Sequence, residues 1–405
     1  MNSSYDIIIV GAGIAGSSTA LALAPKGYRI LLLDRAVFPR HKCCGEGIMP
    51  QGVAVLEELG LLPELLARGG AVFHGIRYRS RRGTWAEADF PPCQDSPDFG
   101  VAMPRFELDH LILQRAKAFT NVTVREGFQV ARVLQEGSVV RGVEGHSGER
   151  PDDRESFSAP LTIATDGPNS IFHRACGLTK TYLPRQRFGV TGHVKGLQGI
   201  DPYVEVLLQP QGEIYVAPCG DGLSLVALLL EKEAMTSFRG DLRERYLSFL
   251  RSAPGLGERM SGAELVGPVL TAGPLGFTVE PCYGPGLLLI GDSAGFLDPI
   301  TGEGMTLALK CVQAAAPLVE EAFATETFGA DLFSRYAEQR ARLVEDLFRL
   351  TQLILAASQH VFLTNRAIRR LSHDRELFRK FLGVVTGGNR YSEISLRDKC
   401  ALLLG

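Results

Sequence analysis

The chain has 405 residues, of which 45% are apolar and 22% charged, and its net charge at neutral pH is −2. This balance is that of a soluble globular protein, and it excludes a nucleic-acid-binding surface that extends over the whole chain. The eight cysteines show neither a disulfide framework nor paired C-x-x-C spacing, so we expect a reducing, cytoplasmic location and no metal site. The first apolar run, residues 7–10, is too short for a secretory signal, and we expect none.

Residues 5–34 have the pattern of a strand, a glycine-rich loop, a helix and a second strand. Gly11, Gly13 and Gly16 follow the first strand at the spacing G-x-G-x-x-G, and the second strand ends on Asp34. Such glycines allow a tight turn, let the backbone approach a pyrophosphate and let the helix pack closely on the strand. An acid about 20 residues later can accept hydrogen bonds from an adenosine ribose. The pattern predicts a dinucleotide site, and a plain glycine turn is the alternative.

Beyond this unit the sequence predicts alternating helices and strands. We expect helices over residues 53–67 and 106–118, and strands within 72–102 and over 122–126, 128–134 and 161–164. Four strand-like runs separated by turn residues predict an inserted antiparallel sheet; they are 190–194, 203–208, 213–217 and 223–230. A helix over 242–250, a buried strand within 286–292 and a helix over 305–323 precede a C-terminal part that is helical from Phe333, with a break near Gly387.

Two further glycine-bearing stretches follow predicted strands. They are Asp166-Gly167 and Gly291-Asp292, the second continuing through Asp298 to Gly302-Glu303-Gly304-Met305. Together with the first loop they resemble the flavoprotein superfamily of para-hydroxybenzoate hydroxylase, geranylgeranyl reductases and flavin-dependent halogenases. The resemblance covers most of residues 1–320 and fades towards the C-terminus.

The resemblance implies an α/β fold. It contains a Rossmann-type, glutathione-reductase-like FAD-binding domain, an inserted antiparallel β-sheet substrate domain and a helical C-terminus. On this ground the discontinuous FAD-binding domain is expected at residues 1–75, 103–182 and 275–330. The substrate domain is expected at 76–102 and 183–274, and the C-terminal helices at 331–405.

The resemblance also implies FAD as the cofactor, with NADPH or NADH as the electron donor. Asp292 is the acid expected on the ribityl hydroxyls, and the helix that begins near Gly304 is expected to point its N-terminus at the flavin pyrimidine. The residues expected to bind the cofactor are Gly11, Gly13, Ala15, Gly16, Asp34, Arg35, Cys44, Gly45, Arg105, Val130 through its backbone, Asp166, Gly167, Asp292, Gly302, Gly304 and Met305. His173, followed by Arg174, stands where the family has an arginine after the Asp166 motif, which leaves the docking of the nicotinamide open.

Two features indicate which groups within the superfamily the chain resembles most. The loop Lys42-x-Cys44-Gly45-Glu46-Gly47 resembles that of geranylgeranyl reductases, where a cysteine lies beside the isoalloxazine. The pattern over residues 187–218 resembles a bacterial group of FAD-dependent oxidoreductases in secondary metabolism. Residues 43–116 contain no lysine, and halogenases of the family place a catalytic lysine in this region. A halogenase is therefore not expected.

Three residues are candidates for catalysis, and each has a structural alternative. Cys44 is either a flavin-side thiol or a small buried side chain. His193 is either a base or a hydrogen-bonded histidine of the sheet, and the second role is the commoner one. Tyr215 alternates with Glu213 onto one face of a strand, and both are expected to line the substrate pocket above the flavin.

The predicted C-terminal helices are apolar on one side and rich in arginine. The arginines are Arg340, Arg342, Arg349, Arg366, Arg369 and Arg370. A basic amphipathic helix lies on a membrane surface in some proteins and packs with a solvated face in others, the commoner case. Peripheral membrane contact is therefore an open alternative.

The function expected first is an FAD-dependent monooxygenase that uses NAD(P)H and O2 to hydroxylate an aromatic or lipophilic secondary metabolite. The alternatives are an ene reductase acting on isoprenoid double bonds and a flavin-binding protein without turnover. The expected partner is a small lipophilic or aromatic substrate, and no nucleic acid is expected. A separate reductase is the alternative to direct reduction by NAD(P)H.

Overall fold

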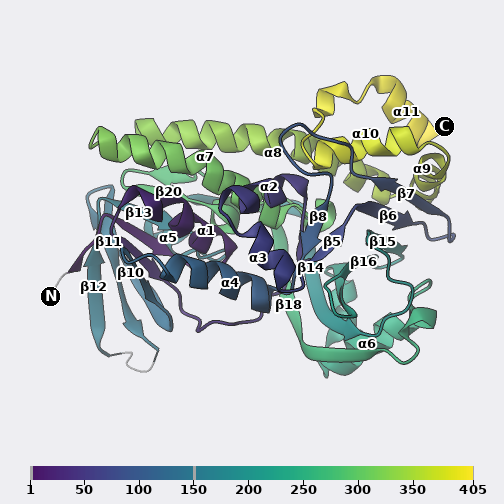
Figure 1. The fold of residues 1–405 in the computed structure, drawn as a ribbon. Coiled ribbons are helices and arrows are strands. Elements are labelled where there is room, and N and C mark those ends of the chain that lie inside the picture. Colours follow the sequence, from purple (N-terminus) through teal and green to yellow (C-terminus); the bar gives the residue numbers. More distant parts are fainter. Residues whose placement is uncertain (1–2, 149–151, 405) are drawn as a thin grey trace.

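The computed structural model describes residues 3–148 and 152–404. Figure 1 shows an elongated molecule in which two sheet-containing halves lie side by side. The helices α7 (Gly304–Ala324) and α8 (Ala330–Ser358) run across the top of this view, and the last helices cover the end of the second half. The α/β class predicted from the sequence is confirmed.

The first half is built on a six-stranded sheet with the order β19-β20-β13-β2-β3-β9. Its inner four strands are short apolar runs that are buried at every residue, as expected of parallel strands covered on both faces. They are β2 (Ile7–Val10), β3 (Ile30–Leu33), β13 (Leu161–Ala164) and β20 (Leu287–Leu289), flanked by β9 (Val122–Arg125) and β19 (Tyr283–Gly284). These four pair in parallel, so their carboxyl ends lie at one edge of the sheet. The helix α1 (Ile14–Leu23) packs against both α4 (Arg105–Lys117) and α7.

Two smaller sheets are also present. One has the order β1-β12-β11-β10 and consists of Ser3–Ser4, Arg154–Ser158, Val139–Ser147 and Phe128–Glu136. The other has the order β4-β8-β5 and consists of Gly47–Ile48, Gly100–Ala102 and Ala71–Phe73. The short helix α5 (Ile171–Ala175) packs on β10.

The second half is an eight-stranded sheet with the order β21-β18-β14-β17-β16-β15-β6-β7. Its strands are β6 (Gly75–Arg79), β7 (Trp85–Asp89), β14 (Thr179–Lys195), β15 (Val204–Gln209), β16 (Gly212–Pro218), β17 (Leu223–Glu231), β18 (Glu264–Glu280) and β21 (Gly295–Phe296). The four strands predicted between residues 188 and 231 are thereby confirmed. The helix α6 (Leu242–Ser252) covers one face, where the buried Tyr246 hydroxyl donates a hydrogen bond to the Val226 carbonyl (2.6 Å). The division of the chain into domains stays a prediction.

The single helix predicted over residues 53–67 is wrong. The structure has two helices, α2 (Pro50–Glu58) and α3 (Leu62–Ala67). Between them Gly60 has a φ of +68°, a left-handed conformation that ends a helix and that glycine adopts without strain. The break lets α2 pack against α7.

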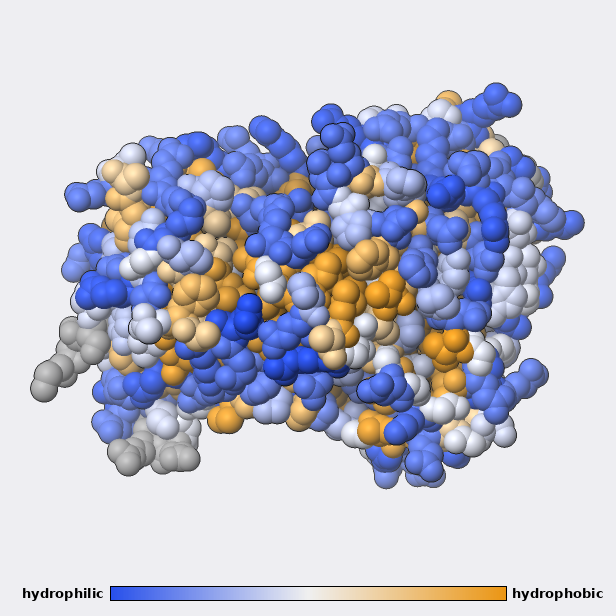
Figure 2. Space-filling model, viewed as in Figure 1, coloured by the Kyte–Doolittle hydropathy of each residue, from blue (hydrophilic) through white to orange (hydrophobic). Residues whose placement is uncertain are grey.

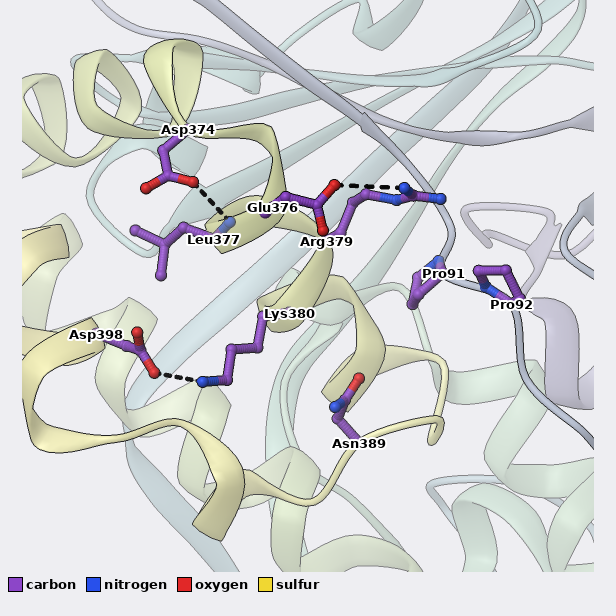
Figure 3. A pocket seen from close by; sticks show the side chains of 9 residues that line it. All are labelled: Pro91, Pro92, Asp374, Glu376, Leu377, Arg379, Lys380, Asn389 and Asp398. Atoms are coloured by element: carbon purple, nitrogen blue, oxygen red, sulfur yellow. Dashed lines mark hydrogen bonds and ion pairs between the residues drawn. The ribbon is translucent and has the colours of Figure 1, made fainter.

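The C-terminal part consists of α8, α9 (Val361–His373), α10 (Arg375–Val385) and α11 (Leu396–Leu404), with the predicted break at Gly387. It is attached to the edge of the eight-stranded sheet by the ring contact between Tyr78 and Phe378 and by the ion pair between Arg375 and Glu87. A polar pocket lies between α10, α11 and the loop at Pro91 (Figure 3). Within residues 3–148 and 152–404, no helix has both the length and the apolar character needed to cross a membrane.

Candidate functional site

The three glycine-bearing strand ends lie side by side and are tied together by hydroxyl groups. Thr165 Oγ1, just after β13, donates to the carbonyls at the end of β2, Val10 O and Gly11 O (2.9 and 2.6 Å). Ser293 Oγ, in the loop after β20, donates to Ala164 O at the end of β13 (2.6 Å). Stretches far apart in the sequence therefore form one continuous edge, as the motifs predicted.

The first glycine loop is closed by backbone packing that leaves no room for side chains. A Cβ on Gly11, whose φ is +105°, would lie 2.4 Å from Thr165 O, and a Cβ on Gly16 would lie 1.8 Å from Gly11 O. The helix α1 begins after Gly13 without a side-chain cap. Its first N–H groups are therefore available to an anion, and the helix dipole favours negative charge there.

Positive charge surrounds this helix end. A Cβ on Gly13 would lie 3.3 Å from Arg40 Nη2 and 3.8 Å from Arg105 Nη2. Asp109, which is fully buried, accepts hydrogen bonds from Nε and Nη2 of Arg105 (both 2.7 Å) and pairs with Arg40 (3.0 Å). The carboxylate thereby fixes both guanidinium groups beside the glycine loop.

The adenosine end of the predicted site is built around Asp34. Its carboxylate accepts the N–H groups of Ala12 and Ala36 (2.7 and 2.8 Å), which places it against the glycine loop. The next residue, Arg35, is exposed. Val130 lies on β10, which starts where the Phe128 N–H donates to Asp34 O (2.8 Å). The proposed contacts of these residues with a cofactor stay predictions.

The opposite end of the edge combines Asp292 with the N-terminus of α7. Asp292 lies in the loop after β20, its side chain is 28% exposed, and Lys42 Nζ is 3.7 Å from its Oδ2. Gly302 adopts a φ of +70° just before α7, which begins without a side-chain cap. Burial raises the pKa of the neighbouring Glu303 carboxyl well above its ordinary value. Burial therefore disfavours the negative charge that would offset the positive end of the helix dipole there.

The side chain of Asp166 is held by the protein, and its contact with a cofactor stays a prediction. The Asp166 carboxylate faces the start of α5, where Oδ2 accepts the Ile171 N–H (3.1 Å), and Oδ1 is buried without a hydrogen bond. Gly167 lines the pocket while the Asp166 side chain does not. His173 lies where the family has arginine, and its Nε2 is 2.7 Å from Ser293 O, so it ties this loop to the loop of Asp292.

We expect Asp166 to make the stability of the protein depend on pH. Burial raises the pKa of its carboxyl from 3.8 to about 6, so the folded state holds a proton that the unfolded state releases between those values. The free energy of unfolding should therefore fall by about 3 kcal/mol from this group as the pH rises from about 4 to about 7. Asp166→Asn removes this loss. Urea denaturation should therefore show that the free energy of unfolding of the variant, relative to that of the wild type, increases as the pH rises across that range. Parallel pH profiles would contradict the assignment.

One pocket runs along the edge and between the two halves. Of the predicted cofactor residues it is lined by Gly13, Ala15, Cys44, Gly45, Arg105, Gly167, Asp292, Gly302, Gly304 and Met305. Gly11, Gly16, Asp34, Arg35, Asp166 and Val130 do not line it; the two glycines lie behind the loop and Asp34 beside it. Figure 2 shows hydrophobic residues gathered in the middle of the molecule, where the two halves meet.

The eight-stranded sheet forms the opposite wall of the pocket. Small residues on adjacent strands leave room above the predicted flavin position. They are Gly189, Thr191, Ala217 and Ala227. Tyr215 stands among them and donates a hydrogen bond to the Ile300 carbonyl (3.3 Å). The wall is therefore apolar, with Tyr215 as its anchored aromatic side chain.

Glu213 does not line the pocket, so the expectation for it is wrong. It shares the strand face of Tyr215, but its carboxylate forms an ion pair with Arg187 of β14. Arg187 is fully buried and also lies 3.7 Å from Asp298, in the loop that leads to α7. From the sequence, Arg187 was only the first residue of the pattern over residues 187–218, and its role was not predicted, although its position two residues before Gly189 places it on the pocket-facing side of β14.

A hydrogen-bonded pair of polar side chains closes the other end of the same wall. His193 of β14 contacts Glu46 Oε2 through Nε2 (2.7 Å), and Glu46 Oε1 accepts the backbone N–H of Arg105 (2.8 Å). Glu46 lines the pocket and belongs to the Cys-Gly-Glu-Gly loop, which the sequence singled out for its cysteine. Cys44 lies in the pocket wall as well. His193 is therefore a hydrogen-bonded histidine of the sheet, and whether it also acts in catalysis stays a prediction.

These features fit FAD. Two uncapped helix N-termini, two fixed arginines and a loop that a Cβ would fill suit a pyrophosphate and an anionic flavin edge. Carboxylates at Asp34 and Asp292 provide acceptors at the two ends where ribose and ribityl hydroxyls would lie.

Asp292→Ala should weaken the binding of FAD by about 10- to 100-fold, because a charged acceptor of hydroxyl groups is worth roughly 1.5–3 kcal/mol. The flavin absorbance retained per protein after gel filtration measures this loss. Asp292→Asn, which keeps an acceptor but not the charge, should lie between the two. A variant that keeps its full flavin content would show that Asp292 does not hold the ribityl chain.

Comparisons with known proteins support FAD as the cofactor. The profile of the family described as "FAD binding domain" matches residues 4–260. The menaquinone reductase of Mycolicibacterium smegmatis is 29% identical over 345 residues, which span 80% of this chain and 79% of that protein. Digeranylgeranylglycerophospholipid reductase 2 of Methanopyrus kandleri is 28% identical over 344 residues, 83% of this chain and 82% of that protein.

Solved structures share the fold. The myxobacterial chondrochloren halogenase CndH, an FAD-dependent halogenase, superposes with a TM-score of 0.80 at 21% identity, covering 98% of this chain and 99% of that chain. At this identity the likeness concerns the fold alone.

Proposed function

The chain belongs to the FAD binding domain family, and on that premise we propose that it is a flavin-dependent reductase that saturates a double bond in an isoprenoid chain. The observation that carries the proposal is the pocket wall of Gly189, Thr191, Ala217 and Ala227, which leaves an apolar space in front of the N-terminus of α7. A flexible hydrocarbon chain fits such a space, because it needs no polar partner there.

The similarity to two reductases over about four fifths of the chain supports the same proposal. The printed names of both relatives denote lipids with isoprenoid chains. From the sequence alone, a monooxygenase was the function expected first. We now favour the reductase, because the similarity to reductases covers about four fifths of the chain.

The residues of the chain have separate tasks in such a reaction. When bound, FAD supplies the two electrons and the hydride. The N–H groups at the start of α7 stabilise negative charge that develops there, and the apolar wall excludes water from the reacting atoms. NAD(P)H is the proposed electron donor, with a separate reductase as the alternative.

The proposed second candidate is the monooxygenase acting on an aromatic or lipophilic secondary metabolite. The specific observation in its favour is Tyr215, because an aromatic ring anchored by its hydroxyl offers a stacking surface to a planar substrate. That a halogenase is not expected stays a prediction, and Lys42 is the one lysine among the residues that line the pocket.

One experiment separates these functions. FAD-loaded protein is reduced with NADPH or with dithionite in the absence of oxygen. It is then mixed with vesicles that contain a geranylgeranyl lipid or menaquinone, and the masses of the products are measured by mass spectrometry. A gain of two hydrogen atoms without oxygen is the expected result. A product that forms only with O2 and gains an oxygen atom, or a bromine atom when bromide is added, overturns the proposal. Reduction of the flavin by dithionite but not by NADPH favours a separate reductase, and no product with either donor favours a flavin-binding protein without turnover.

Peripheral membrane contact is part of the proposal, since such a substrate is held in a bilayer. Phe362, at the start of α9, is 66% exposed, and the Arg366 guanidinium lies over its ring. Val361 beside it is 44% exposed. An exposed apolar pair flanked by arginine suits the boundary between headgroups and acyl chains.

A further inference from the structure

We propose that Glu46 is the acid that delivers the proton to the substrate carbon, and that His193 resupplies Glu46 from solvent. The inference rests on the proposed reductase function, because saturation of a double bond needs a proton as well as a hydride. It concerns the juxtaposition of Glu46, in the pocket wall, with a histidine on the sheet behind it.

Glu46 is placed for this task by four contacts. Its side chain is 2% exposed to solvent, yet the residue lines the pocket. The backbone N–H of Arg105 fixes Oε1 (2.8 Å), His193 Nε2 fixes Oε2 (2.7 Å), and Cys219 Sγ donates to Oε2 (3.7 Å). The Glu46 N–H donates to Cys44 Sγ (3.4 Å). The carboxyl is therefore held in one orientation at the edge of an apolar space.

The backbone of Glu46 is strained in the same place. Its φ is +60°, a left-handed conformation that a non-glycine residue adopts at a cost of about 1 kcal/mol or more. Gly45 and Gly47 flank it, and either would adopt that conformation without strain. The hydrogen bonds of its carboxyl group to Arg105 and His193 hold the residue in this conformation.

His193 connects this buried carboxyl to water. Its side chain is 14% exposed, against 2% for Glu46, and it lies on β14 outside the set of residues that line the pocket. The imidazole can therefore take a proton from solvent on one side and pass one to Glu46 on the other. The charged guanidinium of Arg105 is held by Asp109, so it does not compete for the Glu46 carboxylate.

The steps balance in protons and electrons. The hydride and its two electrons come from the reduced cofactor and form one C–H bond. The π electron pair of the substrate forms the second C–H bond with the proton of Glu46, whose O–H bond breaks to leave a carboxylate. The proton on His193 Nε2 then moves to Glu46, and the imidazole regains a proton from water. NAD(P)H restores the two electrons.

The test follows the two half-reactions of the FAD-loaded enzyme by stopped-flow absorbance. Glu46→Gln keeps an acceptor for the Arg105 N–H but holds no acidic proton, so reoxidation by substrate should slow about 100-fold or more while reduction by the electron donor is unchanged. His193→Ala should slow reoxidation similarly, lose the solvent deuterium isotope effect of the wild type, and recover with added imidazole. Glu205→Gln is the matched control, because Glu205 is equally buried on the same sheet but pairs with Arg259 away from the pocket.

A second measurement is independent of turnover. In the protein without cofactor, the nitrogen NMR signal of one of the eight histidines should shift in Glu46→Gln and not in Glu205→Gln. Wild-type reoxidation rates in both Glu46→Gln and His193→Ala, or no rescue by imidazole, would overturn the relay. If the wild type itself saturates no double bond, the proposed function fails instead, and the NMR result still tells whether the two side chains are coupled.

Discussion

Gly16→Ala is expected to abolish FAD binding and to lower the free energy of unfolding by about 1–3 kcal/mol. Alanine is favoured over glycine inside a helix by about 1 kcal/mol, so propensity alone predicts a more stable protein. The added Cβ, however, would lie 1.8 Å from Gly11 O and 2.6 Å from Thr165 Oγ1. The first of these atoms belongs to the backbone, so α1 must move away from the strand ends. Overpacking of this kind costs about 1–3 kcal/mol, and occasionally more.

Urea denaturation and the flavin content of the purified variant measure the two effects. Gly284→Ala provides the control, because the nearest atom to its added Cβ, on Leu287, is 3.9 Å away, which is an ordinary contact. This variant should keep both the stability and the flavin of the wild type. A Gly16→Ala protein with wild-type stability would show that the close packing of α1 on the loop is not required.

Arg187→Met is expected to cost about 3–5 kcal/mol of stability and to loosen the loop that leads to α7. Arg187 is fully buried, and its removal leaves the carboxylates of Glu213 and Asp298 without their positive partner. Burial raises the pKa of Asp298 and lowers that of Arg187, so the environment already disfavours both charges. The group is therefore stable only as a complete set.

Calorimetry should show a large fall in the melting temperature for the single variant. The double variant Arg187→Met, Glu213→Leu removes both members of the closest pair and should recover most of the loss, since a buried ion pair is often replaceable by apolar side chains. Equal losses in the single and double variants would mean that the packing of the arginine stem, and not its charge, holds the sheet to the loop.

The parts of the site made by backbone were predictable from the sequence. The glycines at positions 11, 16 and 302 predicted close backbone approaches or left-handed turns, which few other residues tolerate. The structure has such a feature at each of the three positions. The buried strands between them are apolar runs with no competing pattern. The convergence of the three loops followed from these local signals together with the rule that parallel strands share one carboxyl edge.

The parts made by side chains from different sheets were not predictable. Alternation placed Glu213 on the correct face, but only the strand order β14-β17-β16 shows that Arg187 reaches across β17 and neutralises it. Glu46 was noted only as a neighbour of Cys44, because nothing in the sequence connects position 46 with position 193. Likewise, the helix over residues 53–67 was predicted across Gly60, since a lone glycine is compatible with a helix until tertiary packing requires a turn.

The ties between the strand ends have a consequence for biosynthesis. Thr165 and Ser293 lock the carboxyl edge, and the helix that completes the pocket begins only at Gly304. A growing polypeptide therefore exposes apolar strands 7–10 and 161–164 on the ribosome for as long as residues 291–305 remain untranslated. We therefore expect FAD to bind only after residues 291–305 have been translated, and a nascent chain truncated before residue 291 to need chaperones to stay out of aggregates.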